Sequence, residues 1–385
     1  MSTFQYGFQQ GIGIEPYLLK GIDKLTGTEN DPHLKIDNLG FLNLLQSQKK
    51  TLELLRAGGN GAIQFITAKY MSRLVEGQTS QSDTCSTANV TPYQEVQVPL
   101  NIYSQIAFYI EDALIQEYTT DLNQETSIGL PPTKAMVAMI DQIKAGANAI
   151  MTNINRQLMN QIVFGTNPTT GSNAASTINF PLNTTNLPLE SGLNEIFAQA
   201  QIAEFATGNL QIFGNGLFHR FMLNQPAKTY DQSGLMTKVQ AMGVDFYYDQ
   251  LSTSILGANE IVVVSPDSIQ LVEYPRYTGN SAGRKGLSDF GTFVLPMQIT
   301  PNQVLPVAFD FQLRFLDCPD QVAGVNDYYG NPISGYRGWQ MIVSKTCGLF
   351  QNPTNAYKAG DFLSGTNGTL RYNIKIGRAS CRERV

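Results

Sequence analysis

The sequence contains one pattern that is typical of a hydrolytic enzyme. Residues 279–283 read GNSAG and match G-x-S-x-G, in which a strained turn between a strand and a helix exposes a nucleophilic serine. That context is missing here, because YPRYT precedes the pattern, RKGLSD follows it, and no histidine comes after it. A hydrolase that uses Ser281 is therefore a distant alternative, and we expect a flexible surface loop at this position.

The side chains that commonly bind metals and phosphates are few and scattered. A structural zinc site needs four cysteine or histidine ligands close together, and no CxxC pair occurs in this chain. The stretch GTNPTTGSN, 165–173, follows a helical pattern and lacks the Lys-Ser/Thr ending of a phosphate loop. We therefore expect no catalytic, cofactor-binding or metal-binding residues. The side chains considered are His33, His219, Cys85, Cys318, Cys347 and Cys381.

The composition favours a chain that is kept in a reducing compartment. The cysteines are scattered and do not suggest a disulfide framework. The start, MSTFQYGFQQ, lacks the basic residues and apolar core of a signal peptide, and no stretch approaches the roughly 20 apolar residues of a membrane span. These observations predict synthesis in the cytosol and no association with a membrane.

The last ten residues, IGRASCRERV at 376–385, differ in character from the charge-poor region before them. Written back into codons, this tail resembles a common sequencing adapter. We therefore treat residues 376–385 as a non-native tail and expect the gene to have been read only as far as Lys375. Removing three arginines and one glutamate makes the net charge of −5 more negative by two.

Charge is both negative overall and unusually sparse. Charged residues make up 15% of the chain, against roughly 25% in an ordinary soluble protein. Asparagine and glutamine together slightly outnumber them. An acidic chain without a Lys/Arg block lacks the electrostatic footprint of a nucleic-acid binder. Neutral amides suit a surface that partners cover, because they can be buried at a lower desolvation cost than ions. A compositional bias of the source organism would explain the amides equally well.

The first third of the chain predicts three successive elements. Residues 1–36 mix aromatics, glycines and turn residues without a period, as in an extended arm that docks on another surface. Residues 37–59 predict a helix with Asp37 as its cap and Gly58-Gly59 at its end. Residues 60–112 predict a long projecting hairpin, because a polar loop separates a β-like stretch from the alternating residues of EVQVPLNIYSQIAFYIE.

The strongest periodic signal predicts one long helix over residues 133–164. Thr133 can cap its start after two prolines, while Gly165 and Pro168 stop it. A stripe of this length must lie along a sheet or a long groove. Apolar residues recur at spacings of three and four: Met136, Ile140, Ile143, Ala147, Ile150, Ile154 and Leu158.

The rest of the chain predicts a mixed α+β region with more strands than helices. A helix is expected over 193–203, followed by a short buried strand in LQIFG. Gly, Pro and Asn turns separate the later expected strands. These strands are NEIVVVSP, SIQLVEY, GTFVLPMQI, VAFDFQLRFLD and GWQMIVSK.

With these elements in order, the chain resembles the major capsid proteins of tailed bacteriophages, which have the Hong Kong 97-type fold. The resemblance covers nearly all of residues 1–375 and depends on the layout of elements. The stretches that carry it are TPYQEVQVPLNIYSQIAFYIE before the long helix, LQIFGNGLF, GVDFYYDQ and NEIVVVSPDSIQLVEY.

The resemblance implies an assignment for every part of the chain. Residues 1–36 would be the N-terminal arm, 37–59 a helix, 60–112 the extended loop, and 113–184 a peripheral domain with the spine helix at 133–164. Residues 185–335 would be the axial domain, with GNSAGRKG in its axial loop, and 336–375 the returning peripheral strands. The missing end of the gene puts the last peripheral strand in doubt.

The function that the resemblance implies is structural and not enzymatic. Identical chains would assemble as hexamers and pentamers into an icosahedral shell that encloses phage DNA without binding it specifically. The chain would be made in the host cytoplasm and end up in the virion, with a separate scaffold and a portal protein as partners. The alternatives are a tail tube protein, a decoration protein, and an encapsulin-like shell protein of a cell.

Overall fold

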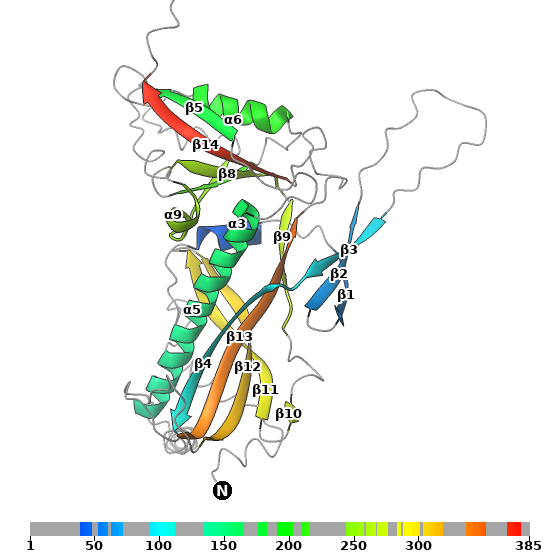
Figure 1. Cartoon of the computed structure of the whole chain (residues 1–385), viewed down its shortest axis with the longest axis vertical. Coiled ribbons are helices and arrows are strands. Elements are labelled where there is room, and N and C mark those ends of the chain that lie inside the picture. Colours follow the sequence, from blue (N-terminus) through cyan, green and yellow to red (C-terminus); the bar gives the residue numbers. More distant parts are fainter. Residues whose placement is uncertain are drawn as a thin grey trace, which may run out of the picture. The chain divides into compact units, whose positions relative to one another are not determined.

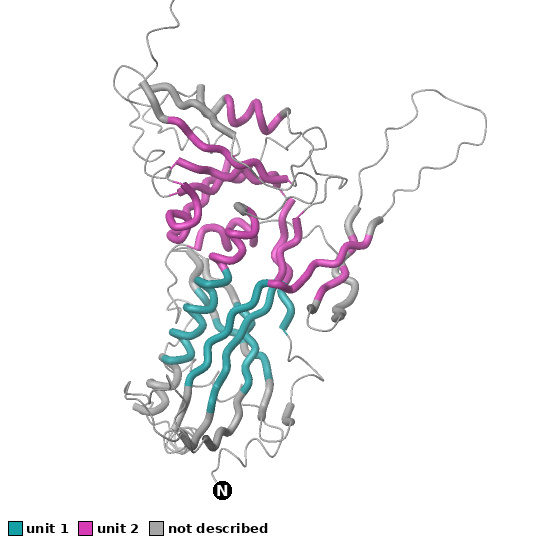
Figure 2. Tube along the Cα trace, in the orientation of Figure 1, with its two compact units in different colours: residues 1–37, 102–154, 273–347 teal, residues 38–101, 155–272, 348–385 magenta. Residues whose placement is uncertain are grey.

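The computed structural model describes two compact units, each with its own β-sheet (Figures 1 and 2). Unit 1 comprises Met1–Asp37, Ile102–Ile154 and Glu273–Cys347, and unit 2 comprises Asn38–Asn101, Asn155–Val272 and Gly348–Val385. The residues that the structure describes are 39–47, 53–60, 63–71, 93–111, 134–164, 176–182, 191–202, 210–215, 244–257, 259–266, 268–275, 283–285, 288–300, 303–318, 336–351 and 368–378.

Most of a six-stranded sheet belongs to unit 1. Its two longest strands have 16 residues each, which corresponds to about 50 Å at ~3.3 Å per residue. The main path of the sheet is antiparallel. Its order is β10 (Gly283–Lys285), β11 (Ser288–Thr300), β12 (Gln303–Cys318), β13 (Tyr336–Gln351) and β4 (Ile102–Glu111), and β9 (Ile269–Glu273) also pairs with β13.

Helix α5 (Lys134–Phe164) confirms the prediction of one long helix. Its 31 residues span about 46 Å, and its residues in unit 1 lie along one face of the six-stranded sheet (Figure 1). The close approach is visible at Gly146, where an added Cβ would lie 2.8 Å from the Ile106 side chain of β4. The predicted stripe is buried where its side chains are described: Ile143, Ala147, Ile150, Ile154 and Leu158.

Alternation through residues 95–107 is also confirmed. Even-numbered side chains are buried or half-buried, while every odd-numbered one is exposed. The exposed set includes three neutral amides, Gln97, Asn101 and Gln105. The period of two continues from β3 (Tyr93–Pro99) into β4 although the two strands belong to different sheets.

Unit 2 contains a mixed five-stranded sheet that is covered on both faces. The order is β5 (Ser176–Leu182), β14 (Thr369–Arg378), β8 (Glu260–Val264), β6 (Gln211–Gly214) and β7 (Asp245–Tyr248). Helix α6 (Ser191–Ile202) covers one face with Ile196 and Ala200, and helix α3 (Gly40–Ser47) covers the other with Phe41, whose ring centroid is 5.0 Å from that of Phe213. Burial on both faces explains why 262–264 is a run of three valines.

A three-stranded antiparallel sheet, with β1 (Glu53–Asn60), β2 (Ile63–Met71) and β3 in that order, also belongs to unit 2. Asn60 pairs with Ile63 at one end of β2, and Met71 pairs with Tyr93 at its other end. The predicted hairpin of 60–112 is therefore confirmed for β2 and β3. It is wrong for 102–111, which pair with β13 instead.

The predicted helix over 37–59 is wrong in its extent. Gly40–Ser47 are helical and Glu53–Asn60 form β1, while residues 48–52 lie outside the described part. Leu39, Leu42 and Leu45 supply the buried apolar spacing of a helix, but Gly58 and Gly59 pair with Phe65 and Gln64 across the β1–β2 ladder. Two glycines destabilise a helix, and here they extend the strand rather than ending a helix.

The predicted boundary of the axial domain, 185–335, does not match the compact units. Residues 273–347 belong to unit 1, because β11 and β12 pair with β13, and β13 pairs with β4. The returning segment 336–375 is divided as well, since β14 pairs with β5 and β8 in unit 2. The predicted peripheral segment 113–184 is divided too, because β5 belongs to unit 2 and pairs there with β14.

Other predictions fall partly or wholly outside the described residues. The arm 1–36, Thr133, His33, His219, Ser281 and residues 379–385 all lie there. Residues 376–378, which were predicted to be excluded from the fold, continue β14 and pair with Phe180, Pro181 and Leu182. Among the described helices, none combines the length and apolarity that a membrane crossing requires.

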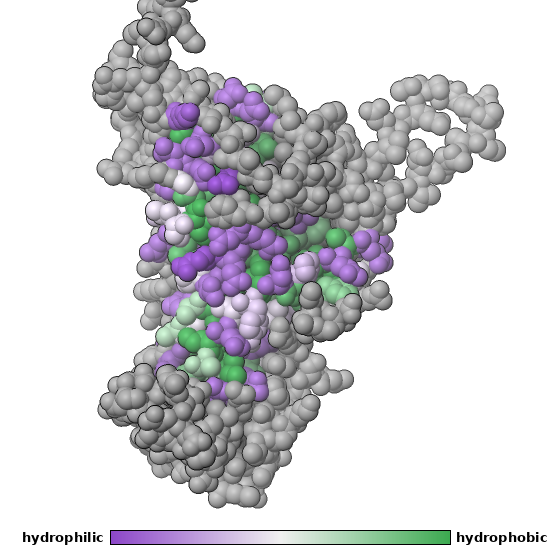
Figure 3. Space-filling view, viewed as in Figure 1, coloured by the Kyte–Doolittle hydropathy of each residue, from purple (hydrophilic) through white to green (hydrophobic). Residues whose placement is uncertain are grey.

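Polar side chains dominate the visible face of the described part, with hydrophobic ones in small groups between them (Figure 3). The large hydrophobic residues that are exposed in the described part are Tyr103 and Val294, at 37% and 42%. Both belong to the six-stranded sheet.

Candidate functional site: a fork in the six-stranded sheet

A cluster of ionisable side chains in the described part of unit 1 lies where the sheet divides. Strands β12 and β13 pair from Cys318 and Tyr336 as far as Asp310 and Ser344. Beyond Ser344, strand β13 continues to pair with β4, and the Tyr274 N–H donates to the Thr346 carbonyl at 3.5 Å on its other side. We call this place, lined by residues 273–275, 308–310 and 345–346, the sheet fork.

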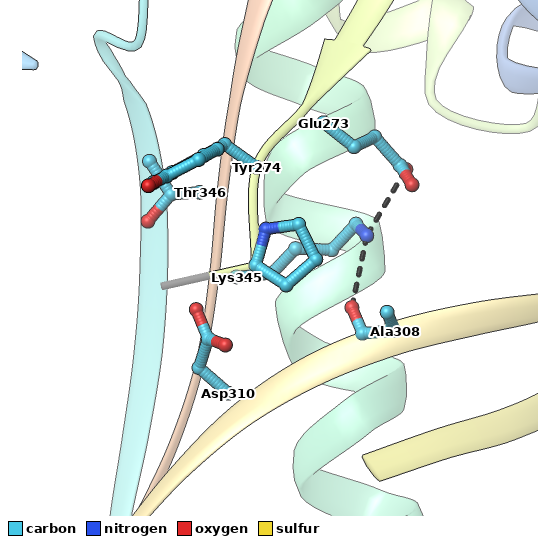
Figure 4. Close-up of a pocket in the computed structure, with 7 residues that line it drawn as sticks. Glu273, Tyr274, Ala308, Asp310, Lys345 and Thr346 are labelled. Atoms are coloured by element: carbon cyan, nitrogen blue, oxygen red, sulfur yellow. Dashed lines mark hydrogen bonds and ion pairs between the residues drawn. The ribbon is translucent and has the colours of Figure 1, made fainter. Parts of the chain in front are cut away.

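Lys345 spans the sheet fork. Its Nζ donates to the Ala308 carbonyl at 3.0 Å and forms an ion pair with Glu273 Oε1 at 3.0 Å (Figure 4). The ammonium also lies 5.7 Å from the centroid of the Phe309 ring, within the range of a cation–π interaction. One side chain thus joins β12, β13 and the end of β9.

Burying the ammonium of Lys345 costs free energy, and its hydrogen bond and ion pair offset that cost. The side chain is 4% exposed and occurs in a run of buried residues, Val343 to Phe350. A buried ammonium is stable only when it is paired and hydrogen-bonded. Because Glu273 is 37% exposed, the pair keeps contact with solvent on one side. The geometry therefore fits a structural ion pair that holds diverging strands.

Asp310 and Thr346 complete the polar lining of the fork. The Thr292 hydroxyl of β11 donates to Asp310 Oδ1 at 2.8 Å, which ties a third strand to the cluster. Thr346 is 2% exposed, and its hydroxyl has no hydrogen-bond partner among the described residues.

Cys347, next to the fork in β13, is a buried free thiol. Burial raises its pKa from the ordinary 9.0 to about 12, with the nearby Lys345 lowering it and Glu273 raising it by smaller amounts. The thiolate is the nucleophilic form, so Cys347 is unreactive at neutral pH.

We expect iodoacetamide at pH 8 to leave Cys347 unmodified in the native protein and to alkylate it in denaturant, as read by mass spectrometry of its peptide.

The raised pKa of Cys347 also has a consequence for stability. Above pH 9.0 the unfolded thiol ionises while the folded thiol stays neutral up to about 12, so this group's contribution to stability falls as pH rises through that window. Rapid alkylation of Cys347 in the native protein would contradict its burial.

A second polar cluster lies in unit 2 around Asp249, which is fully buried. Its Oδ2 accepts from the Phe41 N–H at 3.1 Å and from Asn155 Nδ2 at 2.8 Å, and its Oδ1 accepts from the Leu251 N–H at 2.8 Å. The carboxylate thus caps the first turn of α3, which the sequence had assigned to Asp37. Burial raises the pKa of Asp249, and the three hydrogen bonds lower it by less.

Most of the side chains that were considered for catalysis or metal binding lie outside the described residues. Of the G-x-S-x-G pattern, only Gly283 lies in the described part, at the start of β10. Cys318 ends β12, while His33, His219, Cys85 and Cys381 lie outside the described residues. Within the described ranges, no three His, Cys, Asp or Glu side chains gather as a metal site would need.

Sequence reasoning missed both polar clusters. Glu273, Asp310 and Lys345 are far apart along the chain, and each occurs in a strand pattern where a single charge looks like an exposed position. One signal was available for Lys345. It shares the odd-numbered parity of Met341, Val343 and Cys347, which marks a core-facing side of β13.

Comparisons with known proteins gave matches to solved structures only. No protein-family profile matches the sequence, and no curated protein matches it either. The structure titled "Cyanophage A-1(L) capsid asymmetric unit" is 11% identical, covers 89% of this chain and 94% of its own, and has a TM-score of 0.42.

Two further solved structures are similar over most of the chain. "Capsid structure of the Cyanophage P-SCSP1u" is 10% identical over 85% of this chain and 90% of its own, with a TM-score of 0.38. "Crystal structure of virus-like particle from Pyrococcus furiosus" is 10% identical over 87% and 96%, with a TM-score of 0.31.

Proposed function

We propose that the chain is a major capsid protein, the subunit that assembles with copies of itself into the shell of a tailed phage. The observation that carries the proposal is the order of described elements: a hairpin, a 31-residue helix along a long-stranded sheet, and a second unit built around a mixed sheet. This order agrees with the layout on which the sequence resemblance depends. The proposed role is structural and needs no active site.

The hairpin offers a physical reason for contacts between copies. Strands β2 and β3 pair up to Met71 and Tyr93, and residues 72–92 connect these paired ends. A connection of this length is far longer than the two residues that a tight hairpin needs. Contacts between different surfaces of identical chains close into rings and shells when the rotation is right. In our proposal, the segment 72–92 reaches a neighbouring subunit.

The finer assignments belong to the same proposal. Copies form hexamers and pentamers of an icosahedral shell, and residues 1–36 act as an arm in contacts between copies. The shell encloses DNA without specific binding, which suits a chain with a net charge of −5. A separate scaffold and a portal protein assist assembly in the host cytoplasm. The neutral amides on the exposed side of 95–107 suit a surface that partners cover.

Replacing residues 72–92 with Asn-Gly should leave a folded protein that does not form shells. The register Met71↔Tyr93 brings the two strand ends together, so a two-residue turn can join them without disturbing the ladder. The measurement is negative-stain electron microscopy with light scattering, alongside circular dichroism. As a matched control, a Gly/Ser-rich segment of the original length should restore the connection but not the contacts.

Electron microscopy of the unmodified chain distinguishes the candidate functions. Hollow particles or rings of five and six subunits are expected. Tubes with a fixed narrow bore would replace the proposal with a tail tube protein. Intact shells from the shortened hairpin would overturn the role of 72–92 while leaving the capsid function in place.

A further inference from the structure

The last residues of β13 meet the base of the β2–β3 hairpin at Gly348, and both belong to unit 2 (Figure 2). A Cβ added at Gly348 would overlap the carbonyl oxygen of Pro99 and lie 3.3 Å from Cγ1 of Val98. The Pro99 carbonyl is backbone, so it cannot turn aside as the end of a flexible side chain could. The two strands thus lie against each other with no side chain between them, which is a role that glycine fills in strands.

The base of the hairpin is packed rather than loose. Pro99 belongs to the last pair of the β2–β3 ladder, and Val98 pairs with Ile66 next to it. Val98 is 2% exposed and Ile66 4%, and the two residues that follow the glycine in β13, Leu349 and Phe350, are also buried. Segments that open easily have few buried contacts. These strand ends are therefore held in one position and do not form a free hinge.

The paired strands carry that position outward. The seven residues of β3 span about 20 Å at ~3.3 Å per residue, and β2 and β1 pair alongside them. A tilt at the base of this ladder is transmitted to its far end, where residues 72–92 connect the strands. In the proposed function, that connecting segment reaches a neighbouring subunit.

We propose that Gly348 is a positioning residue, whose missing side chain lets β13 hold the hairpin base at Pro99 and so sets the direction in which the hairpin projects toward a second copy of the chain. The effect on assembly rests on the proposed capsid function. Contacts between identical copies repeat around a closed shell. A small change in the direction of the hairpin therefore changes the angle between neighbours and the diameter at which the shell closes.

Gly348→Ala in the full-length protein inserts one methyl group at this contact. Because the two strands must move apart, we expect amide hydrogen exchange in residues 94–100 to become roughly tenfold faster or more. Circular dichroism should still report a folded chain. Negative-stain electron microscopy should show shells of another diameter, or curved pieces that do not close. Shells of wild-type diameter would overturn the proposal, whatever the exchange rates.

Gly146→Ala is the matched control. It also inserts a methyl group at a tight contact, 2.8 Å from the Ile106 side chain, but both of these residues belong to unit 1 and neither is part of the hairpin. Its exchange in 94–100 and its shell diameter should equal those of the wild type. If Gly146→Ala alters the diameter as much as Gly348→Ala does, general strain explains both results and the proposal fails.

Val98→Ala keeps the test decisive if Gly348→Ala does not fold. It loosens the same contact from the side of the hairpin without creating an overlap, because the side chain that lies nearest to the glycine is shortened. We expect faster exchange in 94–100 and shells of less uniform diameter. Uniform shells of wild-type diameter from this variant would contradict the positioning role.

Failure of the capsid function is a separate result. If the wild-type chain forms no shells or rings, that function fails. The exchange comparison between Gly348→Ala and Gly146→Ala in the unassembled chain then still decides whether Gly348 holds the hairpin base. Equal exchange in 94–100 for both variants would show that it does not.

Discussion

Ile150→Pro is expected to prevent the chain from folding. Ile150 is 1% exposed and lies in the interior of α5. Proline removes the hydrogen bond to the Gly146 carbonyl and clashes with that turn, at a cost of about 3 kcal/mol or more, and the loss of a buried isoleucine side chain adds roughly 2–5 kcal/mol. The sum is comparable to the entire stability of many domains. Circular dichroism and limited proteolysis should report loss of helix and rapid cleavage.

Two further variants separate the backbone defect of Ile150→Pro from its loss of core packing. Ile150→Ala removes only the packing and should give a folded protein with a lower midpoint of unfolding. Ala149→Pro places the same backbone defect at an exposed neighbour and should kink or break α5 without loss of core packing. A folded Ile150→Pro with full helical signal would mean that α5 is not one continuous helix.

Asp249→Ala is expected to destabilise unit 2 by about 3 kcal/mol or more. The substitution leaves the Phe41 N–H, the Leu251 N–H and Asn155 Nδ2 without their acceptor, and each buried donor that loses its partner costs roughly 1–3 kcal/mol. Burial raises the pKa of this carboxylate, which shows that burying its charged form costs free energy. Removing the carboxylate removes that cost and offsets part of the destabilisation. Denaturant unfolding followed by circular dichroism measures the difference.

The pH dependence provides an independent check on Asp249. Because burial raises its pKa, the folded state binds a proton at a higher pH than the unfolded state does. The contribution of Asp249 to stability therefore rises as pH falls through the raised pKa toward 3.8, and Asp249→Asn should lack this rise.

Ser254→Ala is the matched control, since its exposed hydroxyl donates to the Leu251 carbonyl in the same turn. Its effect should stay within about 0.5 kcal/mol. An equally small effect of Asp249→Ala would show that other groups hold α3 in place.

The spacing of apolar residues correctly predicted those helices and strands whose own residues carry a clear pattern. Helix α5 and strands β4, β8, β9, β11, β12 and β13 all have a clear period or a buried apolar run. The segment 37–59 failed because the pairing of β1 with β2 outweighs the helical spacing of its leucines. That pairing depends on residues 63–71, and the pattern within 37–59 contains no information about this partner strand.

The boundaries of the units could not be read from the sequence for the same reason. Each unit is assembled from three separate segments, and the pairings of β13 with β4 and of β14 with β5 join residues more than 100 positions apart. Strand β14 was not predicted from its own residue pattern, because TLRYNIK mixes polar and apolar residues in a short stretch before the tail, and only the resemblance implied returning strands within 336–375. Its partners become evident only in the folded sheet.

The polar clusters show the same limit for sites. Lys345 and Glu273 meet because β13 and the end of β9 come together at the fork, and Asp249 meets Phe41 across 208 positions. No spacing in the sequence encodes these distances. What the sequence could indicate was the order of most elements and the sparse charge, on which the resemblance depends.

The order of strands in unit 2 has a consequence for synthesis on the ribosome. Strand β14 lies between β5 and β8, yet it is translated after both. Until it emerges, β5 has no partner in the sheet, and β8 keeps an open edge that can pair with other nascent chains. Folding of this unit therefore finishes only after β14 has been translated, and chains that stop earlier are left as substrates for chaperones and proteases. The complete five-stranded sheet of unit 2 thus exists only in chains that carry β14.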